Sequence, residues 1–340
     1  MERPVERRPR WLGVLLRLGV SLALLAYVLA QTNWGNVLGL LKGLDVFWLA
    51  VMMLTAPMNV GVCVWKWRLL LASQGHRVPF RTLFGMYVLG QFYGNVLPSS
   101  VGGDVARVAV LSRRIQAPKD ALGSIVVERF TGFSVLILLA IMAIVTVPAF
   151  RRNLPLLAMV LVAVALYAGL LVGILSTRVV WLLRLVGGRC RWLTPLIDKV
   201  ERFQISLRHF GRHPRVLLGA VALSLAFYAG SILTVYAACR GVGQAVPIAK
   251  LAAAVPVVLA VTLVPVTAGG VGLAEWSYRD SFAALAILPD LGLTVSLLLR
   301  IRGLIWSSSG YLIYTLATLG LGRSTASPNT WPDRAACKES

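Results

Sequence analysis

The sequence predicts an all-α fold: a polytopic integral membrane bundle of about six full spans plus two re-entrant helical hairpins in an inverted repeat. Hydrophobic residues make up 58% of the 340 positions and charged residues only 14%, a balance typical of chains whose solvent is lipid. The hydrophobic residues lie in long runs, most of them near the ~20 residues that cross a hydrocarbon core. Two of the runs are shorter and stop at a proline that is followed by paired glycines.

The apolar runs define one membrane domain over residues 12–320, between basic tails at 1–11 and 321–340. Full spans are predicted over 12–30, 45–64, 121–148, 155–175, 216–238 and 293–320. The first span could also be a signal peptide, because it has a basic start and an apolar centre. Its apolar stretch is nearly long enough to cross a membrane, which favours an uncleaved anchor.

The first short run, 82–97, stops at Pro-Ser-Ser-Val-Gly-Gly. Basic residues flank it on both sides, in the segment 65–81, which contains Lys66, and in the segment 113–119. Because Lys and Arg collect in cytoplasmic loops, both flanks are predicted to be cytoplasmic. A hairpin over 82–114 satisfies this requirement if it enters from the cytoplasm, breaks at the proline and returns.

The second short run, 251–264, stops at Pro-Val-Thr-Ala-Gly-Gly and starts the second hairpin, 251–288. It follows the long loop 176–215, the strongest basic signal in the chain, and one further span. The loop is predicted to be cytoplasmic, where it would contact the anionic inner leaflet. The second hairpin therefore enters from outside, and both chain termini are predicted to be cytoplasmic.

The two breaks share a pattern. Gly102 and Gly103 follow Pro98 at the same offsets at which a second glycine pair follows Pro265. Each pair is followed by an acid, then by an arginine, and then by an apolar helix with arginine. In the first unit these residues are Asp104, Arg107 and Glu128-Arg129, and in the second unit they are Glu275, Arg279, Arg300 and Arg302. Two broken elements that enter from opposite faces are typical of transporters with inverted repeats.

A helix that begins after paired glycines exposes free N–H groups and the positive end of its dipole, which suits an anion such as a lipid phosphate. The residues predicted to bind the phosphate are Gly102, Gly103, Arg107, Arg129, Gly269, Gly270 and Arg300. The residues predicted to balance charge, contact a headgroup or carry a proton are Asp104, Glu128 and Glu275. The alternative is that these charges form structural ion pairs that hold the hairpins in place.

Neither an enzyme site nor a nucleic-acid site is indicated. Motifs for hydrolases, metalloproteases and nucleotide binding are missing from the sequence, and its three histidines lie in basic loops. We therefore predict no catalytic residues, no metal and no cofactor. The net charge of +21 is sorted by membrane topology, so no nucleic-acid partner is expected.

The stretch from Asn95 to Arg107, the Glu128-Arg129 pair and the stretch from Pro265 to Glu275 resemble the lysylphosphatidylglycerol synthase transmembrane family, also called flippase-like membrane proteins. The resemblance covers about residues 10–320. It implies a multi-pass protein of the cell (inner) membrane that moves phospholipid-type substrates. In two-part members a soluble carboxy-terminal domain makes the lipid. That synthase domain is expected to be absent here, so lysyl transfer is not expected.

The sequence thus predicts a membrane lipid translocase for an anionic or aminoacylated phospholipid or a related lipid. Two alternatives stay open. One is an integral-membrane enzyme that modifies lipids, and the other is a non-catalytic membrane partner of a lipid or envelope biosynthetic enzyme. A homo-oligomer or a complex with such a partner is also possible.

Overall fold

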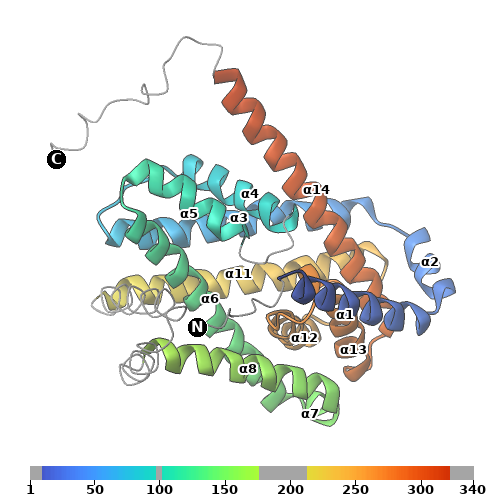
Figure 1. Ribbon diagram of the computed structural model, residues 1–340. Coiled ribbons are helices and arrows are strands. Elements are labelled where there is room, and N and C mark those ends of the chain that lie inside the picture. Colours follow the sequence, from blue (N-terminus) through green and yellow to red (C-terminus); the bar gives the residue numbers. More distant parts are fainter. Residues whose placement is uncertain (1–9, 97–101, 176–212, 322–340) are drawn as a thin grey trace, which may run out of the picture.

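The computed structural model describes residues 10–96, 102–175 and 213–321, and the regular structure of these residues is helical (Figure 1). Most of the predicted amino-terminal and carboxy-terminal tails, the tip of the first hairpin and most of the 176–215 loop lie outside them.

Five helices are long and apolar enough to cross a membrane: α3 (Val46–Ser73), α6 (Pro118–Thr146), α8 (Leu154–Leu175), α11 (Pro214–Gly241) and α14 (Pro289–Leu321). A sixth candidate is the pair α1 (Arg10–Ala30) and α2 (Trp34–Lys42), which is bent by 82°. The chain is therefore an all-α polytopic membrane bundle, as predicted. Its hydrophobic side chains both fill the core and cover the outside, which is expected where lipid is the solvent.

Two short helices were not predicted. The break before α2 is fixed by Asn33, whose side-chain oxygen accepts hydrogen bonds from the backbone N–H groups of Gly35 and Asn36. This N-cap satisfies two of the free N–H groups at the start of the helix. The second short helix is α7 (Pro148–Arg152), which lies between α6 and α8.

The first hairpin consists of α4 (Phe80–Val96) and α5 (Gly102–Ile115), which pack closely through glycines. A β-carbon on Gly103 would lie 2.2 Å from the carbonyl oxygen of Gly90, so the two backbones touch there. Gly90 also faces Arg107, one turn further along α5, whereas Gly94 faces Gly103. The later residue of α4 thus contacts the earlier residue of α5, so the two helices are antiparallel.

The second hairpin consists of α12 (Ile248–Thr262), a 3-10 turn (Ala268–Gly270) and α13 (Leu273–Ala284). The Lys250 ammonium group near the start of α12 donates a hydrogen bond of 2.8 Å to the Leu285 carbonyl just after α13. The chain therefore returns to the end of the bundle from which it came. The predicted helix start directly after Gly270 is wrong, because Gly269, Gly270 and Gly272 all have positive φ and delay the helix to Leu273.

The two hairpins open toward opposite ends of the bundle. Helices α3 and α11 are antiparallel, because Asp45 N–H donates to the Gly241 carbonyl at one end and Gly219 packs on Leu69 at the other. The first hairpin follows the carboxyl end of α3, and the second follows the carboxyl end of α11. This opposite orientation is what an inverted repeat predicts.

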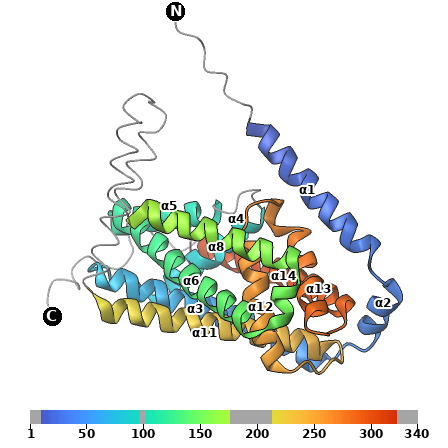
Figure 2. The same ribbon diagram turned by 90° about the horizontal axis from the view of Figure 1, so that it is seen from below.

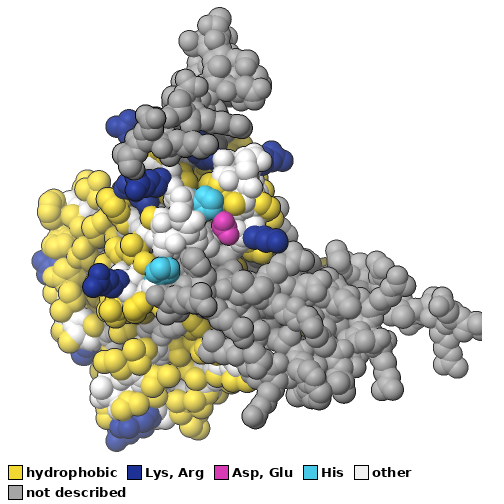
Figure 3. Space-filling model, turned by 90° about the vertical axis from the view of Figure 1, so that its left-hand side faces the viewer, with side chains coloured by type: hydrophobic (Ala, Val, Ile, Leu, Met, Phe, Trp, Pro, Cys, Tyr) yellow, Lys and Arg dark blue, Asp and Glu magenta, His cyan; other side chains and the backbone are white. Residues whose placement is uncertain are grey.

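Figure 3 views the bundle from the end at which α8 ends and α11 begins, and Figure 2 shows it from below. In the part of this face that the structure describes, basic side chains are spread among hydrophobic ones and acidic ones are scarce. His76 and Asp120 form a contact of 2.8 Å there, which joins the loop after α3 to the start of α6.

Candidate functional site

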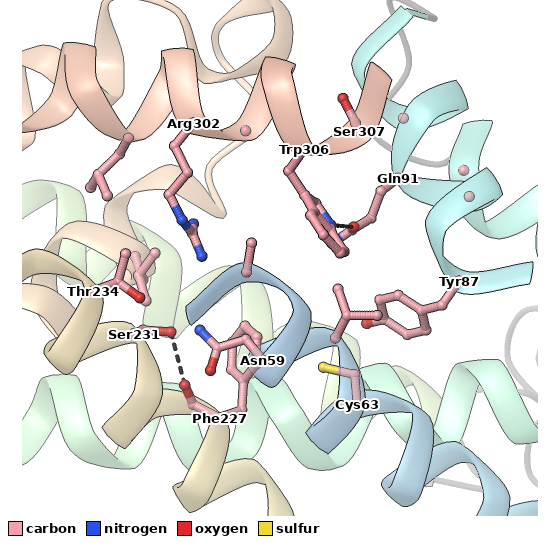
Figure 4. A pocket seen from close by; sticks show the side chains of 18 of the residues that line it. Asn59, Cys63, Tyr87, Gln91, Phe227, Ser231, Thr234, Arg302, Trp306 and Ser307 are labelled. Carbon is pink, nitrogen blue, oxygen red and sulfur yellow. Dashed lines mark hydrogen bonds between the residues drawn. The ribbon is translucent and has the colours of Figure 1, made fainter. Parts of the chain in front are cut away.

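A cavity of about 520 Å³ lies inside the bundle, near the middle of α3, α11 and α14 (Figure 4). This volume is within the range of roughly 300–1,000 Å³ that is common for small-molecule sites. The first hairpin contributes Tyr87, Gln91, Asp104 and Arg107 to the wall, and α14 contributes Arg302 and its neighbours. Charged and polar side chains therefore form part of the cavity wall, although the helices around it are largely apolar.

Arg107 is the centre of the charged end of the cavity. Its side chain is 2% exposed, and its guanidinium group lies 4.2 Å from the ring centre of Trp67 and 4.1 Å from that of Tyr87. It donates a 2.5 Å hydrogen bond to the Glu128 carboxylate, which also accepts from the Tyr87 hydroxyl. A cation that is buried between two rings and paired with a carboxylate is held in one position.

Asp104 connects this buried pair to an accessible arginine. Arg129 donates two hydrogen bonds of 2.9 Å to the Asp104 carboxylate, and Arg107 donates a longer one of 3.3 Å. Glu128 and Arg129 are neighbours on α6, so their side chains point about 100° apart. Glu128 is buried, whereas the Arg129 side chain keeps 45% of its surface exposed and remains able to meet a ligand.

Lys66 adds a further cation behind Glu128. The prediction that it lies in a cytoplasmic loop is wrong, because α3 continues to Ser73 and buries it inside the bundle. Its ammonium group donates to the Glu128 carbonyl at 3.0 Å and to the Ser224 hydroxyl at 3.2 Å. The hydrophobic residues on either side of Lys66 were the available signal that the helix continues.

Arg302 supplies the positive charge on the opposite wall (Figure 4). It donates to the Met52 carbonyl at 2.8 Å and to the Thr55 hydroxyl at 3.1 Å. Both acceptors lie on α3 within the five residues before Pro57. Arg302 thus has two neutral acceptors, and the salt bridges of the described residues do not include it.

Glu275 and Arg300 form a separate ion pair outside the cavity wall. Glu275 is 1% exposed and accepts from the Gly272 N–H at 2.8 Å, so it caps the start of α13 itself. Arg300 donates to the same carboxylate through Nε at 2.8 Å, and its Nη2 lies 2.6 Å from the same oxygen. A carboxylate of the chain therefore already occupies the helix start that the sequence suggested for an anion.

The structure brings together only part of the predicted site. Gly103, Asp104, Arg107 and Arg129 line the cavity, and Glu128 lies directly behind them. Gly102 begins α5, but the described cavity wall does not include it. Gly269, Gly270, Glu275 and Arg300 belong to the second hairpin and its partner helix, away from that wall. Phosphate binding by any of these residues stays a prediction.

The geometry defines a class of protein: a multi-pass α-helical membrane protein with two opposed hairpins and a charged internal cavity. Residues 14–308 match the family described as Lysylphosphatidylglycerol synthase TM region, and the chain belongs to this family. It is also similar to UPF0104 membrane protein MJ1595 of Methanocaldococcus jannaschii, with 24% identity over 249 residues, which are 69% of this chain and 74% of that protein. No solved structure matches the chain.

Proposed function

We propose that this protein is a lipid translocase, which moves an anionic or aminoacylated phospholipid, or a related lipid, between the two leaflets of the cell membrane. The observation that carries the proposal is the cavity at mid-depth of the bundle, with Arg129 on one wall and Arg302 on another. A headgroup that crosses a bilayer needs a polar place at the midplane, because an uncompensated charge is costly in hydrocarbon.

The two arginines suit a lipid phosphate in different ways. Arg129 is held by Asp104 but keeps 45% of its side-chain surface exposed, so it can meet the phosphate first. Arg302 is held by neutral oxygens and keeps its full charge available to an anion. Arginine binds phosphate oxygens through paired N–H donors, which gives both charge and direction.

The opposed hairpins supply a route to alternating access. Each hairpin joins the bundle at one end, and the cavity lies between the first hairpin and α14, which follows the second. Movement of one hairpin at a time would open the cavity toward one leaflet and close it toward the other. The acyl chains would remain in lipid, next to the apolar outer surface. Both chain termini are proposed to be cytoplasmic, as the basic loops suggest.

The proposal is tested by a leaflet-accessibility assay. The purified protein is placed in liposomes that contain fluorescent phosphatidylglycerol, and a membrane-impermeant reagent quenches the label of the outer leaflet. With active protein, the quenched fraction should exceed the roughly one half that the outer leaflet holds. Arg129→Ala and Arg302→Ala should each reduce the rate, whereas Arg113→Ala, at the far end of α5, should not.

The outcomes separate the alternatives. Quenching that stops at one half for every labelled lipid, with folded protein, would contradict passive translocation of those lipids. A lipid-modifying enzyme would instead change the chemical identity of the lipid, which mass spectrometry of the extracted lipids detects. A non-catalytic partner protein would tolerate both arginine substitutions in cells.

A further inference from the structure

We propose that the cavity selects a phospholipid headgroup made of a phosphate and uncharged hydroxyl groups, and that it excludes headgroups with a cationic amine. This inference rests on the proposed function and narrows its substrate. It follows from four features of the cavity and its surroundings: the sign of the charge, the occupation of the carboxylates, the occupation of two aromatic rings and the chemistry of the neutral wall.

The described residues give the cavity a surplus of positive charge. Its wall carries three arginines, at 107, 129 and 302, and one carboxylate, Asp104. Directly behind the wall lie one acidic side chain, Glu128, and one basic side chain, Lys66, so the net positive charge stays the same. A positive surplus inside an apolar bundle is costly until an anion enters, so a bound phosphate is favoured and an additional ammonium group is not.

Both carboxylates near the cavity are already engaged. Both oxygens of Asp104 accept hydrogen bonds from Arg129, and one of them also accepts from Arg107. One oxygen of Glu128 accepts from Arg107 and the other from the Tyr87 hydroxyl. A lysyl or ethanolamine headgroup would have to share Asp104 with Arg129 or compete with Arg107 for the buried Glu128, so neither carboxylate offers it an unpaired negative charge.

Two aromatic rings at this end, those of Trp67 and Tyr87, are occupied in the same way. A cationic headgroup can also bind against the face of an aromatic ring. Here the Arg107 guanidinium lies between the rings of Trp67 and Tyr87, within 4.2 Å of both centres. These two rings therefore already bind a cation of the protein itself.

The remaining wall offers neutral hydrogen-bonding groups. Asn59, Gln91, Ser231 and Thr234 line it together with Arg302, as Figure 4 shows. The indole N–H of Trp306 donates to the Gln91 amide oxygen at 3.0 Å, which fixes that side chain and leaves its amide N–H groups as donors. Such groups suit the hydroxyls of a glycerol headgroup, while Arg302 is near enough on the same wall to meet the phosphate.

The test compares labelled lipids that differ only in the headgroup: phosphatidylglycerol, phosphatidylethanolamine and lysyl-phosphatidylglycerol. In the liposome assay, phosphatidylglycerol should move at least about tenfold faster than both amine-bearing lipids, the ratio that about 1.4 kcal/mol of differential binding gives. Movement of lysyl-phosphatidylglycerol at an equal or higher rate would overturn the inference.

Binding of the same three lipids, measured by native mass spectrometry, keeps the inference separate from the proposed function. If no lipid moves, translocation is contradicted. A preference for phosphatidylglycerol in binding would then still support the selectivity, and equal binding of all three would overturn it.

Substitutions that should reverse the headgroup preference give a sharper test than the comparison of lipids alone. Asn59→Asp places a carboxylate in the cavity with almost no change of shape and should shift the preference toward lysyl-phosphatidylglycerol. Ser231→Asp provides a second variant should the first not fold. Gln116→Asp adds the same charge at an exposed site outside the cavity and should leave the preference unchanged. An unchanged preference in folded Asn59→Asp and Ser231→Asp proteins would contradict the charge argument.

Discussion

Arg300 binds Glu275 across 25 residues of sequence, which is also the separation between Arg129 and Asp104. In each pair the acid is the third residue of the short return helix, because α5 begins at Gly102 and α13 at Leu273. Each arginine lies on the long helix that follows. The two ion pairs are thus equivalent in the two halves of the inverted arrangement.

This equivalence corrects the sequence alignment of the repeat. When the acids and the ion-paired arginines are superposed, the position of Arg107 corresponds to Tyr278, and Arg279 corresponds to Val108. Arg279 instead donates to the side chain and the carbonyl of Gln31, next to the break between α1 and α2. The second unit has about one helical turn of additional residues between its glycine pair and its acid. The glycine pair of this unit lies before α13, because glycines with positive φ keep the chain out of the helix there.

The first prediction concerns the second ion pair. Arg300→Gln should lower the free energy of unfolding by about 2 kcal/mol, because it leaves the buried Glu275 carboxylate without its cation, while a third of the arginine side chain is solvated. Thermal unfolding in detergent, followed by tryptophan fluorescence, measures the loss. Glu275→Gln in the same chain should recover part of it. If the double variant lost the sum of the two single effects, the two side chains would not be coupled.

The second prediction concerns the glycine contact in the first hairpin. Gly103→Ala should destabilise the protein by about 1–3 kcal/mol, because the new methyl group would lie 2.2 Å from the Gly90 carbonyl oxygen. Gly94→Ala is the matched control in the same contact, since its methyl group would lie 4.0 Å from Gly103. Limited proteolysis of the two variants should cut the hairpin faster only in the first. Equal resistance would show that α4 and α5 do not approach as closely as described.

The third prediction concerns the buried arginine. Arg107→Met should cost about 3–5 kcal/mol of stability, because it leaves the Glu128 carboxylate buried without a cation. The yield of monodisperse protein in size-exclusion chromatography should fall accordingly. Adding Glu128→Gln should restore much of that yield, and Arg113→Met at the exposed end of the same helix should change little. A fully stable Arg107→Met protein that fails only in transport would mean that Arg107 serves the ligand rather than the fold.

The fourth prediction concerns orientation. Arg77 lies in the loop before the first hairpin and Gln244 in the loop before the second, at opposite ends of the bundle, and both are exposed. Arg77→Cys should be protected from a membrane-impermeant maleimide in intact cells, whereas Gln244→Cys should react. Cys190 and Cys337 are replaced by serine beforehand, and the native Cys63 and Cys239 are buried. Reaction of both introduced cysteines from the same side would contradict the opposed hairpins.

The sequence alone was sufficient for the membrane class, the long helices and the position of both breaks. Apolar runs and the Pro-Gly-Gly breaks are local features, and lipid leaves few alternatives to a helix. It also identified the charges of the first hairpin, because an arginine or a carboxylate within an apolar run must face the protein interior. These predictions needed no knowledge of which helices are neighbours.

Only the tertiary structure decided which arginine pairs with which acid and which one faces the cavity. Arg300 and Arg302 are two residues apart on α14, so their side chains point roughly 200° apart, and sequence spacing does not say which direction leads to Glu275 and which to the cavity. The burial of Lys66 was also decided by the tertiary structure: its hydrophobic neighbours indicate that the helix continues, but not which face of that helix is buried. Lys66 donates hydrogen bonds to the Glu128 carbonyl and to the Ser224 hydroxyl, and both acceptors lie on helices that are far away in sequence. Local patterns fix where a charge sits on its own helix, but its partner is set by how the helices pack.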